Sequence, residues 1–553
     1  MQFKYIEKQQ RVANQIVEAF KKYNTIFLSA PTGSGKSGIA YLSHEQLFNE
    51  DLYFKSTILA HQKVLMDQYS SLLGGMNNVT AIKGKENYIC EALGDVDVAS
   101  APCQFGLGCD YKPDCEYFQL RNLMNTSPLL ITNYQLVLSM LDVDVYSRHS
   151  NLAIFDECHN LESLFTEYRK VSVDSSELRI LRGVRDSLNK HEENELANPI
   201  DDLILKIERF DTDNAMKSFK EIFDSKKHIV DKLSEKFQNS DTVKYYYNKD
   251  SSFVKKISQF ILLEKRMFSK WYNYTQFKDT TQFIFDFKYT DEVNFNYTLT
   301  PLYIDNMFGK TTQSISDKRL LMSSTIWKPE KMRAQLGQDE DFEFIELDNE
   351  FPPRNRQVNF TPVEGINAEN SQFDHPTFNK LCKQILSICQ KHSERNESGV
   401  IFAPSYKLCF NIEKKLRKEL SQDFRIIMNS SSEERNSAMD EFLRSKQKTI
   451  LISPSFSEGV NFTDDISRFQ IIAKCPYMYL GDKFVRVKAK KDPVWYETNA
   501  FTTIIQAAGR SVRHKEDYAY TYVLDANALK LYTKYEKDIP KWFRDSVSIT
   551  PLG

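Results

Sequence analysis

The stretch Ala30–Ser37, APTGSGKS, constrains the fold of this 553-residue chain more than any other stretch. The apolar run Thr25–Ser29 precedes it, and a segment with a helical pattern begins at Lys36. Gly33 and Gly35 allow backbone N–H groups to curl around phosphate oxygens, and a following helix N-terminus adds partial positive charge. The order of strand, glycine turn and helix predicts a phosphate loop in a parallel α/β sheet.

Different residues of this loop could contact different parts of a bound nucleotide and its metal ion. Lys36 can reach the β- and γ-phosphates, and the Ser37 hydroxyl can ligate Mg²⁺. A chance glycine turn is the alternative, and the intact Gly-Lys-Ser ending disfavours it. Ala30 stands where the pattern usually begins with glycine. We expect the loop to bind ATP through Ala30, Pro31, Thr32, Gly33, Ser34, Gly35, Lys36 and Ser37.

A second acidic motif ends the apolar strand in NLAIFDECHN, Asn151–Asn160. Asp156 would hold Mg²⁺ through water, and Glu157 would orient or deprotonate the attacking water. His159 would couple the nucleotide site to moving parts of the molecule. An Asp-Glu pair after a strand is common, but its position well downstream of Gly-Lys-Ser predicts a nucleotide hydrolase.

Four of the nine cysteines gather in one segment, at Cys90, Cys103, Cys109 and Cys115. The chain begins with no apolar signal core and contains no run of about eighteen apolar residues, so we expect a cytoplasmic protein with no membrane partner. Thiols stay reduced there, which disfavours disulfides. The spacing lacks the close C-x-x-C pair of most structural zinc sites, and the residues alone leave zinc and an iron–sulfur cluster open. The other cysteines lie in apolar or helical patterns and predict core packing: Cys158, Cys382, Cys389, Cys409 and Cys475.

The overall charge is nearly balanced, with a formal net charge of -2, so any polyanion site must be a local basic groove. The densest basic patch with aromatic residues is KFVRVKAKKDPVWYE, Lys483–Glu497. Its cations could follow a phosphate backbone with Trp495 stacking nearby, or form a solvated face. These cations are Lys483, Arg486, Lys488, Lys490 and Lys491.

DECH, Asp156–His159, is the kind of tetrapeptide that defines the DEAH-type helicases of superfamily two, with Cys158 in the alanine position. From here the chain resembles the XPD/DinG family of iron–sulfur DNA helicases over nearly its whole length. Ser324 replaces a second alanine of the family pattern. The other matching segments are KQQRVANQIV, TILAHQKVLMDQ, KGKENYIC, LLITNYQLVL, LLMSSTI, FPPRNR, SFSEGVNFTDD and QAAGRSVRH.

The resemblance assigns roles residue by residue. Gln10 would contact adenine, with Gln9 as the adjacent alternative, and Gly459 lies in the Glu-Gly loop of the second motor domain. Gln506, Arg510 and Arg513 match a helix whose arginines would stabilise charge on the γ-phosphate, and we expect the two arginines to share one helix face. In the family the four-cysteine segment carries a [4Fe–4S] cluster, which favours iron–sulfur over zinc. The cluster would stabilise a small loop-rich domain beside the DNA path.

The resemblance implies an α/β fold with two RecA-like parallel-sheet motor domains, an inserted iron–sulfur cluster domain and an inserted helical arch domain. The period-two pattern of TQFIFDFKYTDEVNFNYTLTPLYI predicts strands that rejoin motor domain one. The tyrosines of VKYYYNK, Val243–Lys249, could stack on bases, although packing within the arch is favoured. The expected boundaries are 1–83, 121–164 and 282–326 for motor domain one, 84–120 for the cluster domain, 165–281 for the arch and 327–553 for motor domain two.

The implied function is that of an ATP-dependent DNA helicase that translocates 5′ to 3′ on single-stranded DNA and unwinds forked DNA, as a monomer. Its cofactors would be ATP, Mg²⁺ and a [4Fe–4S] cluster. The alternatives are a single-strand translocase or protein-displacing motor with little unwinding, and a DEAH-type RNA helicase. A non-enzymatic iron–sulfur scaffold is disfavoured because the motor motifs are intact. The segment before the phosphate loop is too short for the exonuclease of some DinG-like proteins.

Overall fold

The computed structural model describes residues 7–550 apart from residues 74–77, 93, 95, 102, 104–108, 110, 111, 143–145, 238, 280, 290–293, 339, 432, 455–461, 463, 511 and 513. Gly459 and Arg513, two of the expected nucleotide-site residues, therefore lie outside the described residues. Among the residues that are described, no helix combines the length and the apolar character that a membrane span requires.

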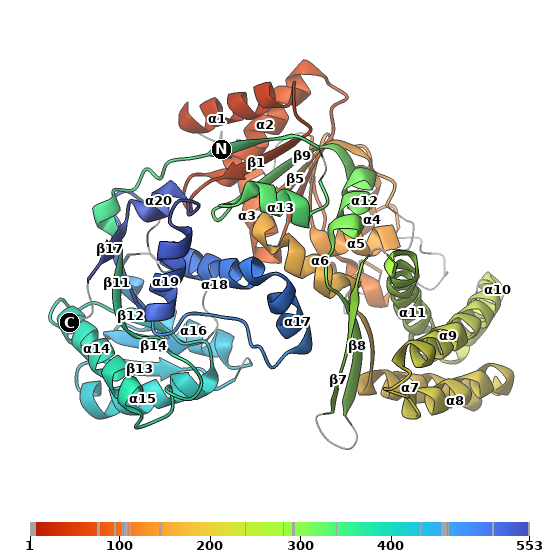
Figure 1. Cartoon of the computed structure of the whole chain (residues 1–553). Helices are drawn as coiled ribbons and strands as arrows, with labels where there is room; N and C mark the ends of the chain where they lie inside the picture. Colours follow the sequence, from red (N-terminus) through yellow and green to blue (C-terminus); the bar gives the residue numbers. More distant parts are fainter. Residues whose placement is uncertain are drawn as a thin grey trace. The chain divides into compact units, whose positions relative to one another are not determined.

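The first large sheet has seven strands and contains the strand before the phosphate loop (Figure 1). Strands β1, β2 and β4 are buried along their whole length, as expected for parallel strands covered on both faces. Pairing is parallel between β2 and β4, β2 and β5, and β3 and β4. In spatial order the strands are β10 (Phe342–Glu346), β1 (Thr25–Ser29), β9 (Ser316–Ser323), β5 (Ser150–Asp156), β2 (Ser56–Ala60), β4 (Leu129–Asn133) and β3 (Val79–Ala81).

Helices follow most strands of this sheet in the chain, which is the βα alternation that the sequence predicts. These helices are α1 (Glu7–Ala19), α2 (Lys36–Glu50), α3 (Lys63–Leu73), α4 (Glu116–Met124), α5 (Tyr134–Asp142), α6 (Leu161–Arg169), α12 (Asp305–Ile315) and α13 (Pro329–Gln335). Short 3₁₀ helices are η1 (Lys85–Asn87), η2 (Val98–Ser100) and η4 (Cys158–Asn160).

The second large sheet is parallel throughout, because all six neighbouring pairs of strands run in the same direction. Successive side chains on a strand enter different apolar clusters: Val400 packs with α16, α18 and α19, and Ile401 packs with α14 and α15. The sheet is therefore covered on both faces. Its strands are β13 (Arg425–Met428), β14 (Thr449–Ser453), β12 (Gly399–Phe402), β15 (Phe469–Ile472), β16 (Ala519–Asp525), β11 (Arg356–Glu364) and β17 (Val547–Ile549).

Two of the helices around this sheet begin with proline at their first turn, where the missing N–H is not needed. The helices are α14 (Pro376–Ser393), α15 (Tyr406–Leu420), α16 (Arg435–Arg444), α17 (Lys483–Lys491), α18 (Pro493–Ala508), α19 (Ala526–Tyr535) and α20 (Lys541–Arg544), with 3₁₀ helices η5 (Pro353–Asn355) and η6 (Asp464–Ile466). The predicted core positions Cys382, Cys389, Cys409 and Cys475 are buried here, and Cys158 is buried in the first unit.

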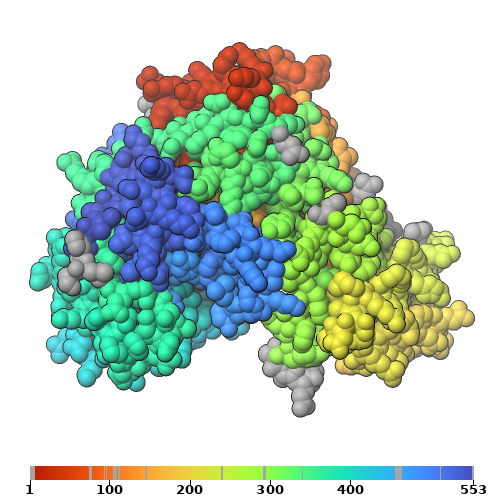
Figure 2. Space-filling model, viewed as in Figure 1, coloured from red at the N-terminus to blue at the C-terminus, as the bar shows by residue number. Residues whose placement is uncertain are grey.

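The arch, which we define as β6, α7–α11, β7 and β8, forms a lobe of its own, yellow to green in the space-filling view (Figure 2). Side chains of Asp174, Asn239 and Asp250 accept backbone N–H bonds at the starts of three of its helices. The helices are α7 (Ser175–Lys190), α8 (Asn194–Glu208), α9 (Ala215–Phe237), α10 (Ser240–Lys249) and α11 (Ser251–Phe277).

The strands predicted to rejoin motor domain one form a different sheet. β7 (Phe283–Tyr289) and β8 (Phe295–Pro301) pair antiparallel and, with β6 (Val171–Asp174), make a separate three-stranded sheet in the order β6-β8-β7. The rings of Phe285 and Tyr297 share one face of this sheet and pack in the apolar core of the arch helices. The alternating pattern therefore predicted strands correctly, but the arch is the partner that covers their apolar face.

The tyrosines of Val243–Lys249 differ among themselves. Tyr246 is buried against Phe253 and donates a hydrogen bond to Glu193, and Tyr247 packs on the arch core. Tyr245 is 60% exposed.

A charged cluster lies inside the arch core. The Lys226 ammonium lies 2.5 Å from a Glu177 oxygen and 3.3 Å from a Glu264 oxygen, and Lys226 and Glu264 are almost completely buried. Burial raises the pKa of Glu177 to about 7, against the opposing attraction of Lys226. The cluster is surrounded by apolar residues such as Phe223 and Phe260.

The chain packs into two compact units. The first comprises Met1–Ile26, Ser37–Leu321 and Glu330–Glu343, and the second comprises Phe27–Lys36, Met322–Pro329 and Phe344–Gly553. The expected start of motor domain two at Trp327 differs from this division because α13 packs with the first unit. Strand β10, which follows it, extends the first sheet beside β1.

Candidate active site

The phosphate loop joins β1 to α2 in the predicted order of strand, turn and helix. Gly33 and Gly35 have φ angles of 82° and 76°, in the left-handed region where a side chain would be strained. The N–H of Ala30 donates to the main-chain oxygen of Ser323 over 2.8 Å. The loop therefore begins beside the end of β9, the strand that carries the Ser-Ser-Thr segment.

That segment is buried and internally bonded. Ser323, Ser324 and Thr325 are at most 8% exposed. The N–H of Thr325 donates to the Ser323 hydroxyl over 3.2 Å, which turns the chain sharply at the end of the strand. The segment therefore lies beside the start of the phosphate loop.

Asp156 lies at the carboxyl end of β5 and is 3% exposed. Its Oδ2 accepts a hydrogen bond of 3.0 Å from the Tyr69 phenol, and its Oδ1 accepts one of 2.9 Å from the N–H of Glu157. Burial and the negative charge of Asp156 raise the pKa of Tyr69 well above its usual range, so this phenol stays protonated. Both carboxylate oxygens of Asp156 therefore have fixed donors. Ser37, the other residue predicted to hold Mg²⁺, lies in the first turn of α2.

The sequence analysis missed two tyrosines at this corner. Tyr69 comes from the middle of α3, and no motif marks it. Tyr134 begins α5 and donates from its phenol to the main-chain oxygen of Asp156 over 2.9 Å. A signal existed for Tyr134 alone, because it directly follows the Thr-Asn turn of a matching segment.

Glu157 has a left-handed backbone, with φ 50° and ψ 48°, which is uncommon for a residue with a side chain. Strain of this kind costs on the order of 1–3 kcal/mol and concentrates at functional sites. One Glu157 oxygen lies 3.4 Å from His159 Nδ1, and both side chains remain partly accessible.

The two glutamines before the phosphate loop occupy different positions on α1. Gln10 donates to the Asn14 side chain over 3.2 Å on the exposed side of the helix. Gln9 is buried, and its amide lies so close to Gly38 that an added Cβ there would meet it at 3.0 Å. The residue expected to contact adenine, Gln10, therefore points along its own helix, and the alternative Gln9 packs against the phosphate-loop helix.

The late glutamine–arginine motif is partly helical. Gln506 is buried near the end of α18, which ends at Ala508 with Gly509 as its cap. Arg510 lies in the turn beyond the helix, and its main-chain oxygen accepts the N–H of Phe462 over 3.1 Å. Because α18 ends at Ala508, Arg510 does not lie on a face of this helix, contrary to the prediction. Arg513 itself lies outside the described residues.

Among the described residues, no disulfide joins the four early cysteines. Cys90 and Cys115 are buried, and Cys103 and Cys109 are partly exposed. Cys115 precedes α4 and packs in an apolar cluster with Tyr88 and Tyr117. The N–H of Cys90 donates to Val96 over 2.8 Å, which closes a short loop after the first cysteine.

Positive charge surrounds this segment. Lys85 is half-buried near Cys103, and burial together with Arg121 and Arg266 lowers its pKa. A cubane cluster on four thiolates carries net negative charge, which nearby cations stabilise. Four thiols, an apolar shell and adjacent cations therefore fit an iron–sulfur group.

The basic patch of Lys483–Glu497 is partly unavailable to a nucleic acid. Lys488 and Trp495 are buried and pack together, with the ammonium 4.7 Å from the centre of the indole ring. They form the contact between α17 and α18, so neither can follow a phosphate backbone or stack on a base. Arg486, Lys490 and Lys491 are exposed.

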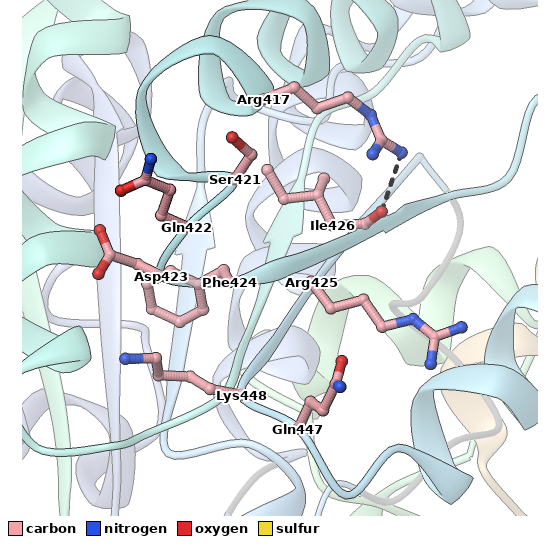
Figure 3. Close-up of a pocket in the computed structure, with 9 residues that line it drawn as sticks. All are labelled: Arg417, Ser421, Gln422, Asp423, Phe424, Arg425, Ile426, Gln447 and Lys448. Carbon is pink, nitrogen blue, oxygen red and sulfur yellow. Dashed lines mark hydrogen bonds between the residues drawn. The ribbon is translucent and has the colours of Figure 1, made fainter.

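A hollow of about 570 Å³ lies on the second unit, where α15 ends and β13 and β14 begin (Figure 3). Arg417 donates across it to the main-chain oxygen of Ile426 over 2.9 Å, and Arg425 and Lys448 have partners beyond its rim. Ligands of parallel sheets bind at the carboxyl ends of the strands, whereas this hollow lies at the amino ends. It is therefore not the nucleotide site.

Two family models match the chain. The model described as "Type III restriction enzyme, res subunit" matches residues 2–182, and the model described as "Helicase C-terminal domain" matches residues 385–546. The first covers the phosphate loop and the Asp-Glu motif, and the second covers the Gln506 helix.

Curated relatives share parts of the sequence. The chain is 26% identical over 168 residues to the ATP-dependent DNA helicase chl-1 of Caenorhabditis elegans, covering 27% of this chain and 20% of that protein. It is 25% identical over 236 residues to the ATP-dependent DNA helicase CHL1 of Candida albicans, covering 36% of this chain and 27% of that protein. In both cases the chain spans less than a third of the relative's length.

Solved structures share the fold over the whole chain. An XPD helicase has a TM-score of 0.62 at 15% identity, with 99% of this chain and 100% of that chain covered. Xpd4 of S. tokodaii has a TM-score of 0.58 at 13% identity, with the same coverage. The chain therefore has the two RecA-like α/β domains of these XPD structures. Its similarity to the helicase C-terminal model and to the CHL1 helicases supports the resemblance stated from the sequence.

Proposed function

We propose that the chain is an ATP-dependent DNA helicase that moves on single-stranded DNA and unwinds duplex. One observation carries the proposal: Tyr69 and Asp156 form a buried hydrogen-bonded corner, directly followed by the strained Glu157. Such a corner suits the hydrolysis of a nucleotide bound to Mg²⁺. Relatives named as ATP-dependent DNA helicases support DNA as the polymer that is moved.

Different residues of the chain would have different roles in ATP hydrolysis. Backbone N–H groups of the loop from Ala30 to Ser37 and the Lys36 ammonium bind the phosphates. Ser37 directly and Asp156 through water would hold Mg²⁺, which would supply positive charge to the phosphates. Glu157 accepts a proton from the attacking water, and His159 beside it limits where the carboxylate can point. Arg510 would add positive charge at the γ-phosphate.

We further propose that the four-cysteine segment holds a [4Fe–4S] cluster as a structural staple. Its thiolates would be those of Cys90, Cys103, Cys109 and Cys115. The segment has few apolar residues of its own, so metal–thiolate bonds would supply stability that its small core cannot. We also propose that the protein moves 5′ to 3′ and is a monomer, because the family resemblance implies both.

The decisive experiment compares nucleic acids. The purified chain is assayed for phosphate release with no nucleic acid, with single-stranded DNA and with single-stranded RNA, and then for separation of a forked DNA duplex. We expect DNA-stimulated hydrolysis and unwinding. Stimulation by RNA alone would favour the RNA helicase, and hydrolysis without unwinding would favour a translocase. Absence of hydrolysis under every condition would refute the proposal.

A further inference from the structure

Two stretches of the second unit meet where α18 ends. One stretch contains η6, which begins at Asp464, and the other follows Arg510 in the turn beyond α18. The N–H of Phe462 donates to the main-chain oxygen of Arg510 over 3.1 Å. Further along the second stretch, the ring of His514 lies with its Nε2 2.9 Å from Oδ1 of Asp464. The segment that follows α18 is therefore attached to the η6 stretch at two places.

A largely buried ion pair fixes the two stretches behind the His514 ring. Arg468, just before β15, donates to the Asp517 carboxylate over 2.7 Å and to the main-chain oxygen of Tyr518 over 2.9 Å. It also lies 3.0 Å from an oxygen of Asp465. The N–H of Asp517 donates to the main-chain oxygen of His514 over 3.2 Å. Arginine and paired carboxylates keep their charges around neutral pH, so His514 is the group described here whose charge changes in that range.

The ring of His514 lies between two carboxylates. Asp464 faces its Nε2, and an oxygen of Glu516 lies 3.4 Å from its Nδ1. The backbone of Asp464 is left-handed, with φ 55°, which is uncommon for a residue with a side chain. A protonated imidazole can donate from both nitrogens, whereas the neutral ring has a single N–H and can serve only one of the two carboxylates. Loss of the proton therefore removes one of these contacts.

The other charged groups beside this ring are paired with one another. Arg468 pairs with Asp517, and Lys515, which follows His514, lies 3.8 Å from an oxygen of Glu350. Both cations thus have carboxylate partners of their own. The hydrogen bond from the η6 carboxylate is the main cause that raises the pKa of His514 above its ordinary value. More of these rings are therefore charged at neutral pH than in an isolated histidine, and the charge is lost as the pH rises further.

The segment beyond α18 matters for the proposed reaction because Arg510 would stabilise charge on the γ-phosphate. We infer that His514 is a positioning residue: its protonated ring holds the segment that carries Arg510 against η6. When the ring loses its charge, one of the two attachments weakens and the bond from Phe462 remains. ATP hydrolysis then slows, while nucleotide binding through the phosphate loop changes little. This inference rests on the proposed function and adds to it a control of hydrolysis by pH.

His149 provides a matched comparison in the first unit. Its Nε2 lies 3.0 Å from Oδ1 of Asp317, and the two side chains are 51% and 66% exposed, against 47% and 56% for His514 and Asp464. The His149 pair joins the amino ends of β5 and β9, whereas Asp156 lies at the carboxyl end of β5. The effect of losing an exposed histidine–aspartate pair can therefore be separated from the effect of freeing the segment beyond α18.

The first test measures steady-state ATP hydrolysis by the full chain, with saturating single-stranded DNA, from pH 6 to pH 9. Other groups titrate too, so each variant is compared with wild type at every pH. For His514→Gln, which resembles the neutral ring, we expect kcat to be about 3-fold lower at pH 6.5, with an unchanged KM and no difference at pH 9. That size is typical of an exposed ion pair. His514→Arg should keep its advantage over His514→Gln up to pH 9, and His149→Gln should match wild type throughout.

The second test does not depend on hydrolysis. Hydrogen exchange is measured for the peptide of residues 509–518 in the full chain at pH 6.5. Exchange should be about 3-fold faster in His514→Gln and in Asp464→Asn, and the two effects should not add in the double variant because they remove the same contact.

Three results would overturn the inference: a kcat difference for His514→Gln that stays constant with pH, an equal loss for His149→Gln, or unchanged exchange in His514→Gln. If wild type hydrolysed no ATP, the proposed function would fall, and the role of His514 in hydrolysis with it. The exchange measurements would still show whether the ring holds the segment, so the two failures can be told apart.

Discussion

Replacing Lys226 by methionine tests how the charged cluster holds the arch together. Methionine keeps most of the length of the side chain but removes its charge, so Glu177 and Glu264 would remain in the core without a cation. Removing one partner of a buried ion pair costs about 3–5 kcal/mol. For a domain of the size of the arch, that loss lowers the melting temperature by roughly 10–20 °C.

The measurement is hydrogen exchange of peptides from α9 and α11 in the full chain, which reports the arch separately from the motor sheets. We expect much faster exchange for Lys226→Met. The matched control is Lys227→Met, one residue further along, where the side chain is 68% exposed and pairs only with Asp231. An exposed pair of this kind contributes about 0.5 kcal/mol or less. Wild-type exchange for Lys226→Met, or equal effects of both variants, would refute the reasoning.

The same cluster predicts a pH dependence with a definite sign. The pKa of Glu177 is about 7 in the folded arch and near its ordinary 4.5 when the chain is unfolded. The folded state therefore binds a proton that the unfolded state releases, so stability falls as pH rises from about 4.5 to about 7. The loss amounts to about 3 kcal/mol and ends above pH 7. Corrected exchange rates of α9 should rise between pH 6 and pH 7 in wild type but not in Glu177→Gln, and a flat wild-type profile would contradict the assignment.

Three further predictions address the proposed sites. Lys36→Ala should reduce ATP hydrolysis by at least about 100-fold while single-strand binding, measured by fluorescence anisotropy, stays within a few-fold, because the proposed role of its ammonium is to bind the nucleotide phosphates. Loss of folding in that variant would count against the role. Cys103→Ser should lower iron content and visible absorption and abolish unwinding while some ATP hydrolysis remains, and unwinding at the wild-type rate would oppose a cluster staple beside the DNA path. Gln9→Ala should raise the KM for ATP at least about 5-fold whereas Gln10→Ala should not, because only Gln9 packs on the phosphate-loop helix, and the reverse order would restore Gln10 as the adenine contact.

Much of the motor architecture follows from local pattern. The phosphate loop is readable because strand, paired glycines and helix lie next to one another in the chain, and their geometry depends on little else. The buried strands Thr25–Ser29 and Thr449–Ser453 are continuous apolar runs, which is the pattern of parallel strands. The Asp-Glu motif at the end of β5 could be found for the same reason.

Features that depend on distant partners could not be predicted. A period-two pattern identifies β7 and β8 as strands, but only the arch helices determine which sheet they join. Lys488 reads as a surface cation until α18 brings Trp495 against it. Tyr69 carries no local signal, because its hydroxyl meets Asp156 only when α3 packs beside the end of β5.

Strand β10 has a practical consequence for dividing the molecule into pieces. Because β10 lies beside β1, a fragment ending at residue 326 would lack β10. Strand β1, which leads into the phosphate loop, would then be an edge strand with unpaired backbone N–H and C=O groups. Such a fragment would be prone to aggregate by pairing through β1, the strand that leads into the phosphate loop. Expression trials for an isolated amino-terminal motor should therefore keep the chain at least to Leu347, whose N–H bonds to Ser29 over 2.9 Å.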